Sequence, residues 1–440
     1  MQKYVIIGTG PAGVAAAEAI RGQDSGAQIT LIGDEPWGYY SRPGLAYYLT
    51  GELSEKSLFP FTKQDFQKLD LNIRYSRIRQ INPHEHQIEN HKGQKLSYDR
   101  LLIATGACAV RIEMDGINLD GVVVLDNLDD ARQIIKLSRK SRSAVVVGGG
   151  ITALEIVEGL ISQGVKTHYF LRGDRYWSNV LDETESRIVE SRLRHEGVHI
   201  HYHTELAEII EKRGRVAGVI TKNGEHIKCK TLAVAIGIQP RIELAVKAGL
   251  QTARGILVNE YLQSSSPDIF AAGDVAQVYD PYSGKSVVDS LWGPARLQGH
   301  AAGLNMTGVT TPYIKAVPFN VTRLAGLTTT IIGTVGRGSD LDLKGIARGD
   351  SETWRQLPDA IAAQSNFDVN RLRIMVGTEH LIGAIVMGDQ TLSQPLYHLI
   401  LNRANISSIC DNLLNPDVKL GDVISNFWTQ WSSRNALSTK

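Results

Sequence analysis

Two glycine-rich turns carry the clearest chemistry in this sequence. GTGPAG occupies Gly8–Gly13 and GGGITA occupies Gly148–Ala153. Each follows an apolar β-branched run and precedes an alanine- or leucine-rich stretch typical of a helix. Strand, tight turn and helix in this order form a dinucleotide-binding fingerprint, in which helix N–H groups and the positive end of the helix dipole meet a pyrophosphate. The duplication predicts two dinucleotide sites.

Each residue of such a turn has its own task. The first glycine makes the bend, the second lets the backbone approach the pyrophosphate, and the third position lies at the helix–strand contact. Ala153 takes that third position in the second turn, where a methyl group can be accommodated. The expected cofactor-binding residues of the two turns are Gly8, Gly10, Pro11, Ala12, Gly13, Gly148, Gly150, Ile151, Thr152 and Ala153.

The residue that ends the strand after each glycine turn distinguishes the two sites. A carboxylate there, roughly 20 residues beyond the turn, accepts hydrogen bonds from a ribose. After the first turn, AQITLIG runs into Asp34 and Glu35. We favour Glu35 as the ligand of the adenosine ribose of an unphosphorylated nucleotide such as FAD.

The second site has no acid at this position. Its strand VKTHYFL ends at Leu171, followed by Arg172, Gly173, Asp174 and Arg175. Guanidinium groups match phosphate geometry, so Arg172, with Arg175 beside it, predicts NADPH in preference to NADH. The alternative is that both arginines are ordinary surface residues at a strand end.

Three further motifs give the sequence a family resemblance. RLLIATGA, LAVAIGIQP and SPDIFAAGDVAQ follow in order along the chain, and together with the two turns they resemble the FAD-dependent pyridine nucleotide-disulfide oxidoreductase superfamily. The resemblance implies an α/β fold with two Rossmann-like domains, for FAD and NAD(P), plus a C-terminal α+β domain. It also implies that Asp274 accepts hydrogen bonds from the ribityl chain. Further residues that it assigns to the cofactors are Ala104, Thr105, Gly106, Gly237 and Gly273.

Within the superfamily, YYSRPGL and LWGPARLQGHAAGLNMTG resemble the NADH:rubredoxin, ferredoxin reductase and nitrite reductase flavoprotein group. Pro294 is expected to start a helix beneath the flavin, with Trp292 and Ala295 as further contacts. Arg42 and Pro43 are expected near the flavin or its pyrophosphate, and Glu155 near the same ring from the nicotinamide side. Arg42 and Glu155 form the expected catalytic set, and a pair between them is a hypothesis. As alternatives, Arg42 is a solvated loop cation and Glu155 an ordinary carboxylate on a helix face.

The cysteines argue against thiol chemistry. Cys108, Cys229 and Cys410 form neither a redox pair nor a metal-ligand spacing, and Pro43 stands where the oxidase and CoA-disulfide branch carries a cysteine. We expect no metal site. Electrons therefore pass from reduced flavin directly to an acceptor.

Composition limits the partners. Lys and Arg number 47 against 46 Asp and Glu, a net charge of +1, which gives no argument for nucleic acid. No uninterrupted apolar run approaches the ~18 residues of a membrane span, and the chain enters a strand directly after MQK. We expect a cytoplasmic protein without membrane attachment.

The expected domains are interleaved: residues 1–110 and 246–320 bind FAD, 111–245 bind NAD(P), and 321–440 form the C-terminal domain. Hairpins are predicted at HQIENHKGQKLSYDRLLIA and at the RG and NG turns within 209–235. Strands followed by helices are predicted from Pro318 onward, and residues 337–370 form an insertion that shapes acceptor choice or merely decorates the surface. The tail with Trp428 and Trp431 packs on its own domain, joins subunits in a homodimer, or contacts a membrane surface.

The leading functional prediction is an FAD-dependent NAD(P)H oxidoreductase. It would pass electrons to a small redox protein such as rubredoxin or ferredoxin, or to a partner subunit. Two alternatives remain: a type II NAD(P)H:quinone oxidoreductase, which would need the Trp-bearing tail to bind lipid, and a flavin-bound redox sensor or assembly protein.

Overall fold

The chain forms two compact units in the computed structural model, which describes residues 1–336, 344–349, 370–415 and 417–436. Unit 1 contains residues 1–113, 123–137 and 236–315, and unit 2 contains residues 114–122, 138–235 and 316 onward. Most of the predicted insertion at 337–370 lies outside the described residues, apart from strand β24 (Lys344–Gly349) and Asn370.

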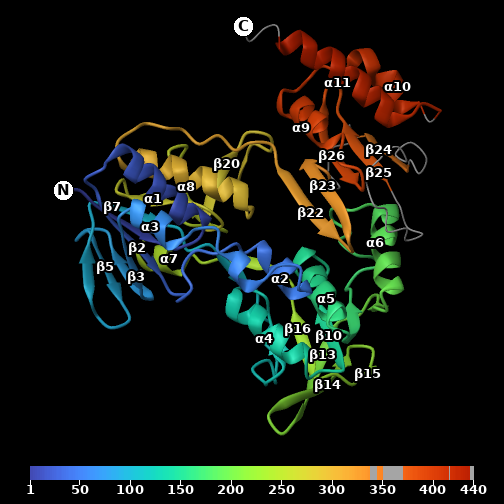
Figure 1. Ribbon diagram of the computed structural model, residues 1–440, viewed down its shortest axis with the longest axis horizontal. Coiled ribbons are helices and arrows are strands. Elements are labelled where there is room, and N and C mark those ends of the chain that lie inside the picture. Colours follow the sequence, from blue (N-terminus) through green and yellow to red (C-terminus); the bar gives the residue numbers. More distant parts are fainter. Residues whose placement is uncertain (337–343, 350–369, 416, 437–440) are drawn as a thin grey trace. The chain divides into compact units, whose positions relative to one another are not determined.

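A five-stranded parallel sheet forms the centre of unit 1 (Figure 1). Its order is β19-β7-β1-β2-β3. The strands are β1 (Lys3–Ile7), β2 (Gln28–Gly33), β3 (Leu71–Tyr75), β7 (Arg100–Ile103) and β19 (Ile269–Ala271). The apolar run YVII lies in β1, where its side chains are buried. Because β1 pairs with β2 on one side and β7 on the other, the chain reverses its strand order there, and a ligand-binding crevice is expected at the carboxyl ends of these strands.

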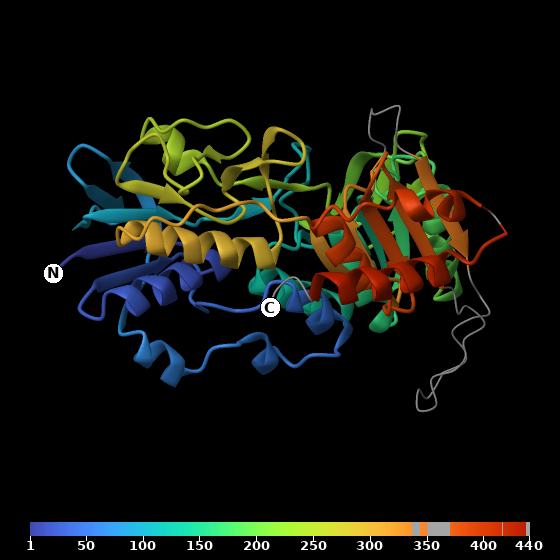
Figure 2. The same ribbon diagram turned by 90° about the horizontal axis from the view of Figure 1, so that it is seen from above.

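Two parallel helices cover this sheet. Helices α1 (Pro11–Gln23) and α8 (Trp292–Met306) lie side by side in Figures 1 and 2. A Cβ on Gly299 would lie 2.0 Å from the carbonyl oxygen of Ala12, and one on Gly303 would lie 2.5 Å from that of Ala16. Glycine is therefore required for this approach, and the matching direction of the two contacts brings both helix N-termini to the same end.

The prediction that Pro294 starts α8 was wrong by two residues. The helix begins at Trp292, and Pro294 is its third residue. The difference is small in energy because the first four N–H groups of a helix have no partner within the helix, so proline loses nothing there.

Residues 123–137 belong to unit 1, although the sequence placed them with the NAD(P) segment. Side-chain contacts explain this. The Leu128 N–H donates to the Tyr40 hydroxyl at 3.1 Å, and Arg132 donates to both oxygens of Glu55. The remaining elements of unit 1 are α2 (Gly44–Thr50), η1 (Glu55–Leu58), α3 (Lys63–Lys68), β4 (Ile78–Asn82), β5 (Gln87–Asn90), β6 (Lys95–Ser97), β8 (Ala107–Ala109), α4 (Leu128–Ser138), β17 (Ile238–Pro240), α7 (Glu243–Lys247), β18 (Ile256–Leu257), β20 (Ala276–Asp280) and β21 (Lys285–Val288).

A second sheet, of order β12-β11-β10-β16-β9, lies in unit 2. Central β10 pairs in parallel with β11 and β16. The three predicted hairpins are confirmed by the antiparallel β5–β6, β13–β14 and β14–β15 pairs. Arg213 and Gly214 in the RG turn both have positive φ, as a two-residue hairpin turn requires. The elements are β9 (Val122–Val123), β10 (Ser143–Val147), α5 (Ile151–Ser162), β11 (Lys166–Phe170), α6 (Glu183–His195), β12 (His199–His201), β13 (Leu206–Lys212), β14 (Arg215–Thr221), β15 (His226–Ile227) and β16 (Thr231–Val234).

An antiparallel sheet of order β22-β23-β26-β25-β24 begins at Phe319, which confirms the predicted C-terminal strands. Trp428 and Trp431 pack against its hydrophobic core. Their rings stack on each other, and Trp428 stacks on His398, so packing within the domain accounts for these side chains. The elements are β22 (Phe319–Leu324), β23 (Leu327–Gly333), β25 (Arg371–Val376), β26 (Leu381–Met387), α9 (Ser393–Leu401), η2 (Ser407–Ile409), α10 (Cys410–Leu414) and α11 (Leu420–Ala436).

The predicted fold class is confirmed: two Rossmann-like parallel sheets and a C-terminal α+β segment. The domain boundaries stay a prediction, because the second parallel sheet and the C-terminal sheet fall in one compact unit. Among the described residues, no helix is both long enough and apolar enough to cross a bilayer.

Candidate dinucleotide-binding sites

A cavity of about 940 Å³ opens in unit 1 at the carboxyl ends of β1, β2, β7 and β19. Pockets that hold cofactors and other small molecules reach this size. Most of the predicted FAD-binding residues line it: Gly8, Gly10, Pro11, Ala12, Glu35, Arg42, Pro43, Ala104, Thr105, Gly106, Gly273, Asp274, Trp292 and Ala295. Gly13, Gly237 and Pro294 do not line the cavity.

The first glycine turn has the geometry of a phosphate cradle. A Cβ on Gly8 would lie 2.0 Å from the carbonyl oxygen of Ala104, and one on Gly13 would lie 2.0 Å from that of Gly8. Gly10, in contrast, faces open space, with nothing within 4 Å of its Cβ position. No side chain caps the N-terminus of α1. Its free N–H groups and the open face of Gly10 therefore fit the pyrophosphate of a dinucleotide.

Glu35 lies in the cavity, as the sequence predicted, and is held there by two donors. Its carboxylate accepts from the Arg42 guanidinium and from the Tyr40 hydroxyl, the latter at 2.6 Å. Burial raises the pKa of Tyr40 well above its usual range, and the neighbouring carboxylate adds to the shift. Tyr40 therefore stays a neutral donor that orients Glu35 over the whole working pH range.

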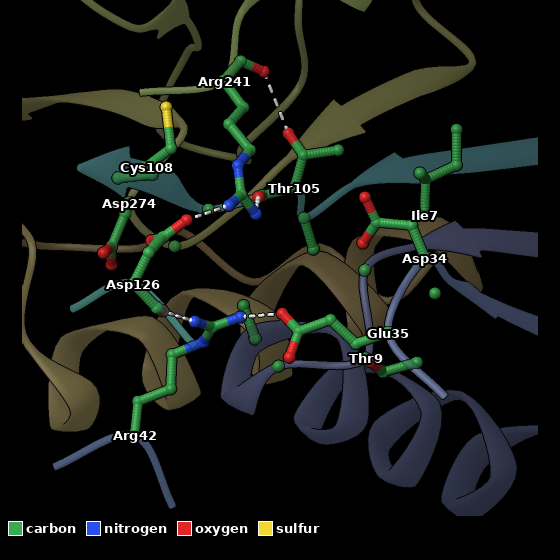
Figure 3. Close-up of a pocket in the computed structure, with 18 of the residues that line it drawn as sticks. Ile7, Thr9, Asp34, Glu35, Arg42, Thr105, Cys108, Asp126, Arg241 and Asp274 are labelled. Carbon is green, nitrogen blue, oxygen red and sulfur yellow. Dashed lines mark hydrogen bonds and ion pairs between the residues drawn. The ribbon is translucent and has the colours of Figure 1, made fainter. Parts of the chain in front are cut away.

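A chain of charged groups crosses the cavity (Figure 3). The Arg42 guanidinium donates to the backbone carbonyl of Asp126 as well as to Glu35, and the Arg241 guanidinium donates to the Asp126 carboxylate at 2.6 Å. Our sequence analysis missed Asp126 and Arg241. Arg241 directly follows the LAVAIGIQP motif, which could have drawn attention to it, whereas no local pattern marks Asp126.

Asp274 lines the same cavity. Burial raises its pKa to about 6, Arg42 opposes the shift, and Asp289 adds to it. A carboxylate in such a dry position is stabilised by donors that approach it, and sugar hydroxyls are donors of that kind.

The second glycine turn repeats the steric pattern of the first. A Cβ on Gly148 would lie 2.1 Å from the carbonyl oxygen of Ala235, whereas Gly150 has nothing within 4 Å. Ala153 is buried against Gly148, with its Cβ 3.1 Å from the Gly148 Cβ position. Ile151 and Thr152 open α5, whose N-terminus also lacks a side-chain cap. This turn also fits a dinucleotide pyrophosphate.

The residues after β11 differ in how far their side chains are exposed to a ligand. Leu171 is buried. Arg175 points inward: its guanidinium donates to the Asp174 carboxylate at 3.0 Å, and its side chain is 9% exposed. Arg172 is exposed. Of the two predicted phosphate-binding arginines, Arg172 is therefore the accessible one.

Glu155 lies half-buried on α5, one turn before Glu158. Burial raises its pKa to about 7, and the charge of Glu158 contributes. Arg42 belongs to unit 1 and Glu155 to unit 2, so the pair between them stays a prediction.

The three cysteines lie in separate elements and are all free. Cys108 lines the cavity from β8, Cys229 is buried after β15, and Cys410 begins α10. Among the described side chains, no group of three or more His, Cys, Asp or Glu is placed to hold a metal ion.

Comparison with known proteins decides the family. Residues 2–296 match the family described as pyridine nucleotide-disulphide oxidoreductase. The chain belongs to this family. It is therefore an oxidoreductase that uses FAD and a nicotinamide nucleotide.

Relatives in the family include electron-carrier reductases. The chain is 28% identical, over 92% of its length and 98% of the relative's, to the ferredoxin–NAD(+) reductase component of 3-phenylpropionate/cinnamic acid dioxygenase from Photorhabdus laumondii subsp. laumondii. It is 30% identical to a rubredoxin-NAD(+) reductase from Pseudomonas putida, over 70% and 80% of the two chains. The fold matches the reductase in a covalent putidaredoxin reductase–putidaredoxin complex, with a TM-score of 0.84, 24% identity, and coverage of 97% and 98%.

The residues on the two turns fit the family's cofactors. Bound FAD would supply two-electron chemistry with a nicotinamide and one- or two-electron chemistry with an acceptor. The chain offers groups of the required kind: the N-termini of α1 and α5 carry N–H groups without a side-chain cap, and Glu35 and Asp274 place carboxylates in the cavity of unit 1.

Proposed function

We propose that this protein is an FAD-dependent reductase that passes electrons from NADPH to a small redox protein of the ferredoxin or rubredoxin kind, without a cysteine disulfide. The separation of its cysteines is the observation that carries the proposal. Of the three cysteines, Cys108 alone lines the cavity of unit 1, and Pro43 stands at the position where the oxidase and CoA-disulfide branch carries a cysteine. Relatives named as ferredoxin and rubredoxin reductases support the same acceptor class.

Both FAD-side and nicotinamide-side roles are part of this proposal. Glu35, Arg42, Thr105 and Asp274 would hold FAD, and the N-terminus of α8 at Trp292 would direct its positive dipole end to the anionic edge of the reduced ring. Gly150 and the start of α5 would hold the nicotinamide nucleotide, with Glu155 close to the ring system.

The preference for NADPH rests on Arg172. The exposed Arg172 guanidinium, two residues after the end of β11, would meet a 2′-phosphate, and Leu171 puts no carboxylate there to repel it. Asp174 neutralises Arg175, so one arginine would carry most of the selectivity.

The acceptor is tested with a cysteine-free enzyme. FAD-loaded wild type and the Cys108→Ala, Cys229→Ala, Cys410→Ala triple variant are supplied with NADPH and with a ferredoxin, a rubredoxin, oxidised glutathione or hydrogen peroxide. We expect carrier reduction to agree within about twofold between the two proteins, and disulfide and peroxide reduction to be negligible. Loss of carrier reduction in a folded, FAD-loaded triple variant would contradict the proposal.

A cytoplasmic location and a homodimer formed through the C-terminal segment also stay proposals. Cell fractionation tests the first, and sedimentation of the purified protein tests the second.

A further inference from the structure

Arg241 joins two segments that are far apart in the sequence. Its guanidinium donates to the Asp126 carboxylate at 2.6 Å, and its backbone carbonyl accepts a hydrogen bond from the Thr105 hydroxyl at 3.1 Å. The side chains of Arg241 and Asp126 are 29% and 17% exposed, and both residues line the cavity of unit 1. The pair therefore lies in the binding site and not on the open surface.

Asp126 also contacts a second arginine. Its backbone carbonyl accepts from Arg42, while its carboxylate accepts from Arg241 (Figure 3). Asp126 thus lies between two guanidinium groups of the same cavity and accepts hydrogen bonds from both. Those groups reach it from different segments of the fold, the loop before α2 and the residue after β17.

Both arginines keep donors for a ligand. A guanidinium has five N–H donors. The hydrogen bonds of the Arg241 side chain to Asp126 and to the Thr105 carbonyl engage two of its nitrogens. Glu35 and the Asp126 carbonyl likewise engage two nitrogens of Arg42. Planar guanidinium forks of this kind match phosphate oxygens.

We propose that Arg241 is a diphosphate-binding residue of the FAD site, that it acts with Arg42 as a two-arginine cradle, and that Asp126 is the positioning residue between them. The ligand group is the diphosphate of the dinucleotide, which carries two negative charges. The cradle would complement the N–H groups of the Gly8–Gly13 turn, which offer partial positive charge alone. This inference rests on FAD binding by the family and is independent of the electron acceptor.

The test compares two flavins that differ in phosphate. FAD contains the diphosphate and the adenosine, and riboflavin contains neither, so a loss confined to FAD places the contact of Arg241 on that half of the molecule, where the phosphates are the anionic groups that a guanidinium binds. Apoprotein of wild type, Arg241→Met and Arg254→Met is titrated with each flavin, and binding is followed by flavin fluorescence. Arg254 is the matched control, because it is an exposed arginine of the same unit outside the cavity.

We expect Arg241→Met to weaken FAD binding by about 10- to 100-fold, which corresponds to about 1.4 to 2.8 kcal/mol, and to change riboflavin binding by less than twofold. Arg254→Met should change neither. Asp126→Asn, which leaves the backbone carbonyl in place, should give a smaller loss confined to FAD.

Two results would overturn the proposal. One is unchanged FAD affinity in a folded Arg241→Met protein. The other is an equal loss of FAD and riboflavin affinity, which would make the Arg241–Asp126 pair a support of the loops alone. If Arg241→Met does not fold, Arg241→Gln keeps N–H donors for Asp126 without the positive charge, and the same ratio decides.

Discussion

Asp174 pairs with Arg175 at 3.0 Å, and this leaves Arg172 as the exposed guanidinium at the end of β11. We therefore expect Arg172→Glu to lower kcat/KM for NADPH by about 10- to 100-fold, because a carboxylate would face the 2′-phosphate, and to leave NADH within a few-fold. Steady-state kinetics with both nucleotides measures this. Asp174→Asn is the matched variant and should raise NADPH affinity, since it removes a negative charge nearby. A fall with NADH as large as that with NADPH would argue against this phosphate contact.

Two glycines of the second turn can be compared, because one is required by backbone packing and the other leaves room for a ligand. Gly148→Ala places its methyl group against the Ala235 carbonyl and should destabilise the protein, whereas Gly150→Ala meets open space and should fold normally. With FAD still bound, Gly150→Ala should raise KM for NADPH, because the methyl group occupies the approach path of the pyrophosphate. Thermal unfolding and kinetics of the two variants separate these effects. Unchanged kinetics in Gly150→Ala would contradict a nucleotide site at this turn.

Glu155 should make stability depend on pH. Its pKa is raised to about 7 in the folded protein from about 4.5 in the unfolded chain. The folded protein therefore keeps the Glu155 proton up to a higher pH than the unfolded chain does. The loss of stability caused by ionised Glu155 is absent below about pH 4.5, because Glu155 is then protonated in both states. It grows as the pH rises to about 7 and stays constant above that pH. Glu155→Gln should therefore raise the free energy of unfolding by about 1–3 kcal/mol at pH 8 and leave it unchanged at pH 4.5. Denaturant unfolding at both pH values measures the difference. A constant difference at the two values would rule out this titration.

Asp274 should make FAD binding weaker as the pH falls, whereas Glu155 lowers stability as the pH rises. Its pKa is raised to about 6, so below that pH it is protonated and no longer a charged acceptor. We expect FAD to dissociate faster as pH falls from 7 to 5, and Asp274→Asn to show the fast release at both values. Flavin fluorescence after dilution follows the release. A release rate in wild type that does not change over this range would contradict the assignment.

Arg373 fixes the C-terminal sheet to the rest of unit 2. It donates to Glu185 at 2.9 Å and to the carbonyl of Val180 at 2.7 Å, and both Arg373 and Glu185 are buried. Arg373→Met should lower the free energy of unfolding by about 1–3 kcal/mol, because buried Glu185 would lose its nearest guanidinium and keep only Arg371, at 3.9 Å, as a cationic neighbour. The double variant with Glu185→Gln should recover part of the loss. No recovery would mean that packing, and not charge, sets the cost.

Local patterns predicted the parts of the fold that local sterics determine. Gly8 and Gly148 could be assigned because a close backbone approach admits no side chain there, and the RG hairpin turn because it needs positive φ at both residues. The start of α8 was placed too late because the first turn of a helix tolerates proline at several positions.

Contacts between segments far apart in the sequence could not be predicted from local patterns. Asp126 and Arg241 are separated by 115 positions, and each is an ordinary charged residue in its own neighbourhood. Only the fold brings them to one cavity. The same reason explains why residues 123–137, which the sequence placed with the NAD(P) segment, lie in compact unit 1: the Tyr40 hydroxyl accepts from the Leu128 N–H, and Arg42 donates to the Asp126 carbonyl.

Anaerobic rapid mixing of the FAD-loaded protein with NADPH and, separately, with NADH tests the central claim most directly, with flavin absorbance as the readout. We predict fast bleaching by NADPH, slower bleaching by NADH, and recovery of the oxidised spectrum when an oxidised ferredoxin or rubredoxin is added. Absence of bleaching with either nucleotide would contradict a working nicotinamide site, and equal or faster bleaching by NADH would contradict the role of Arg172.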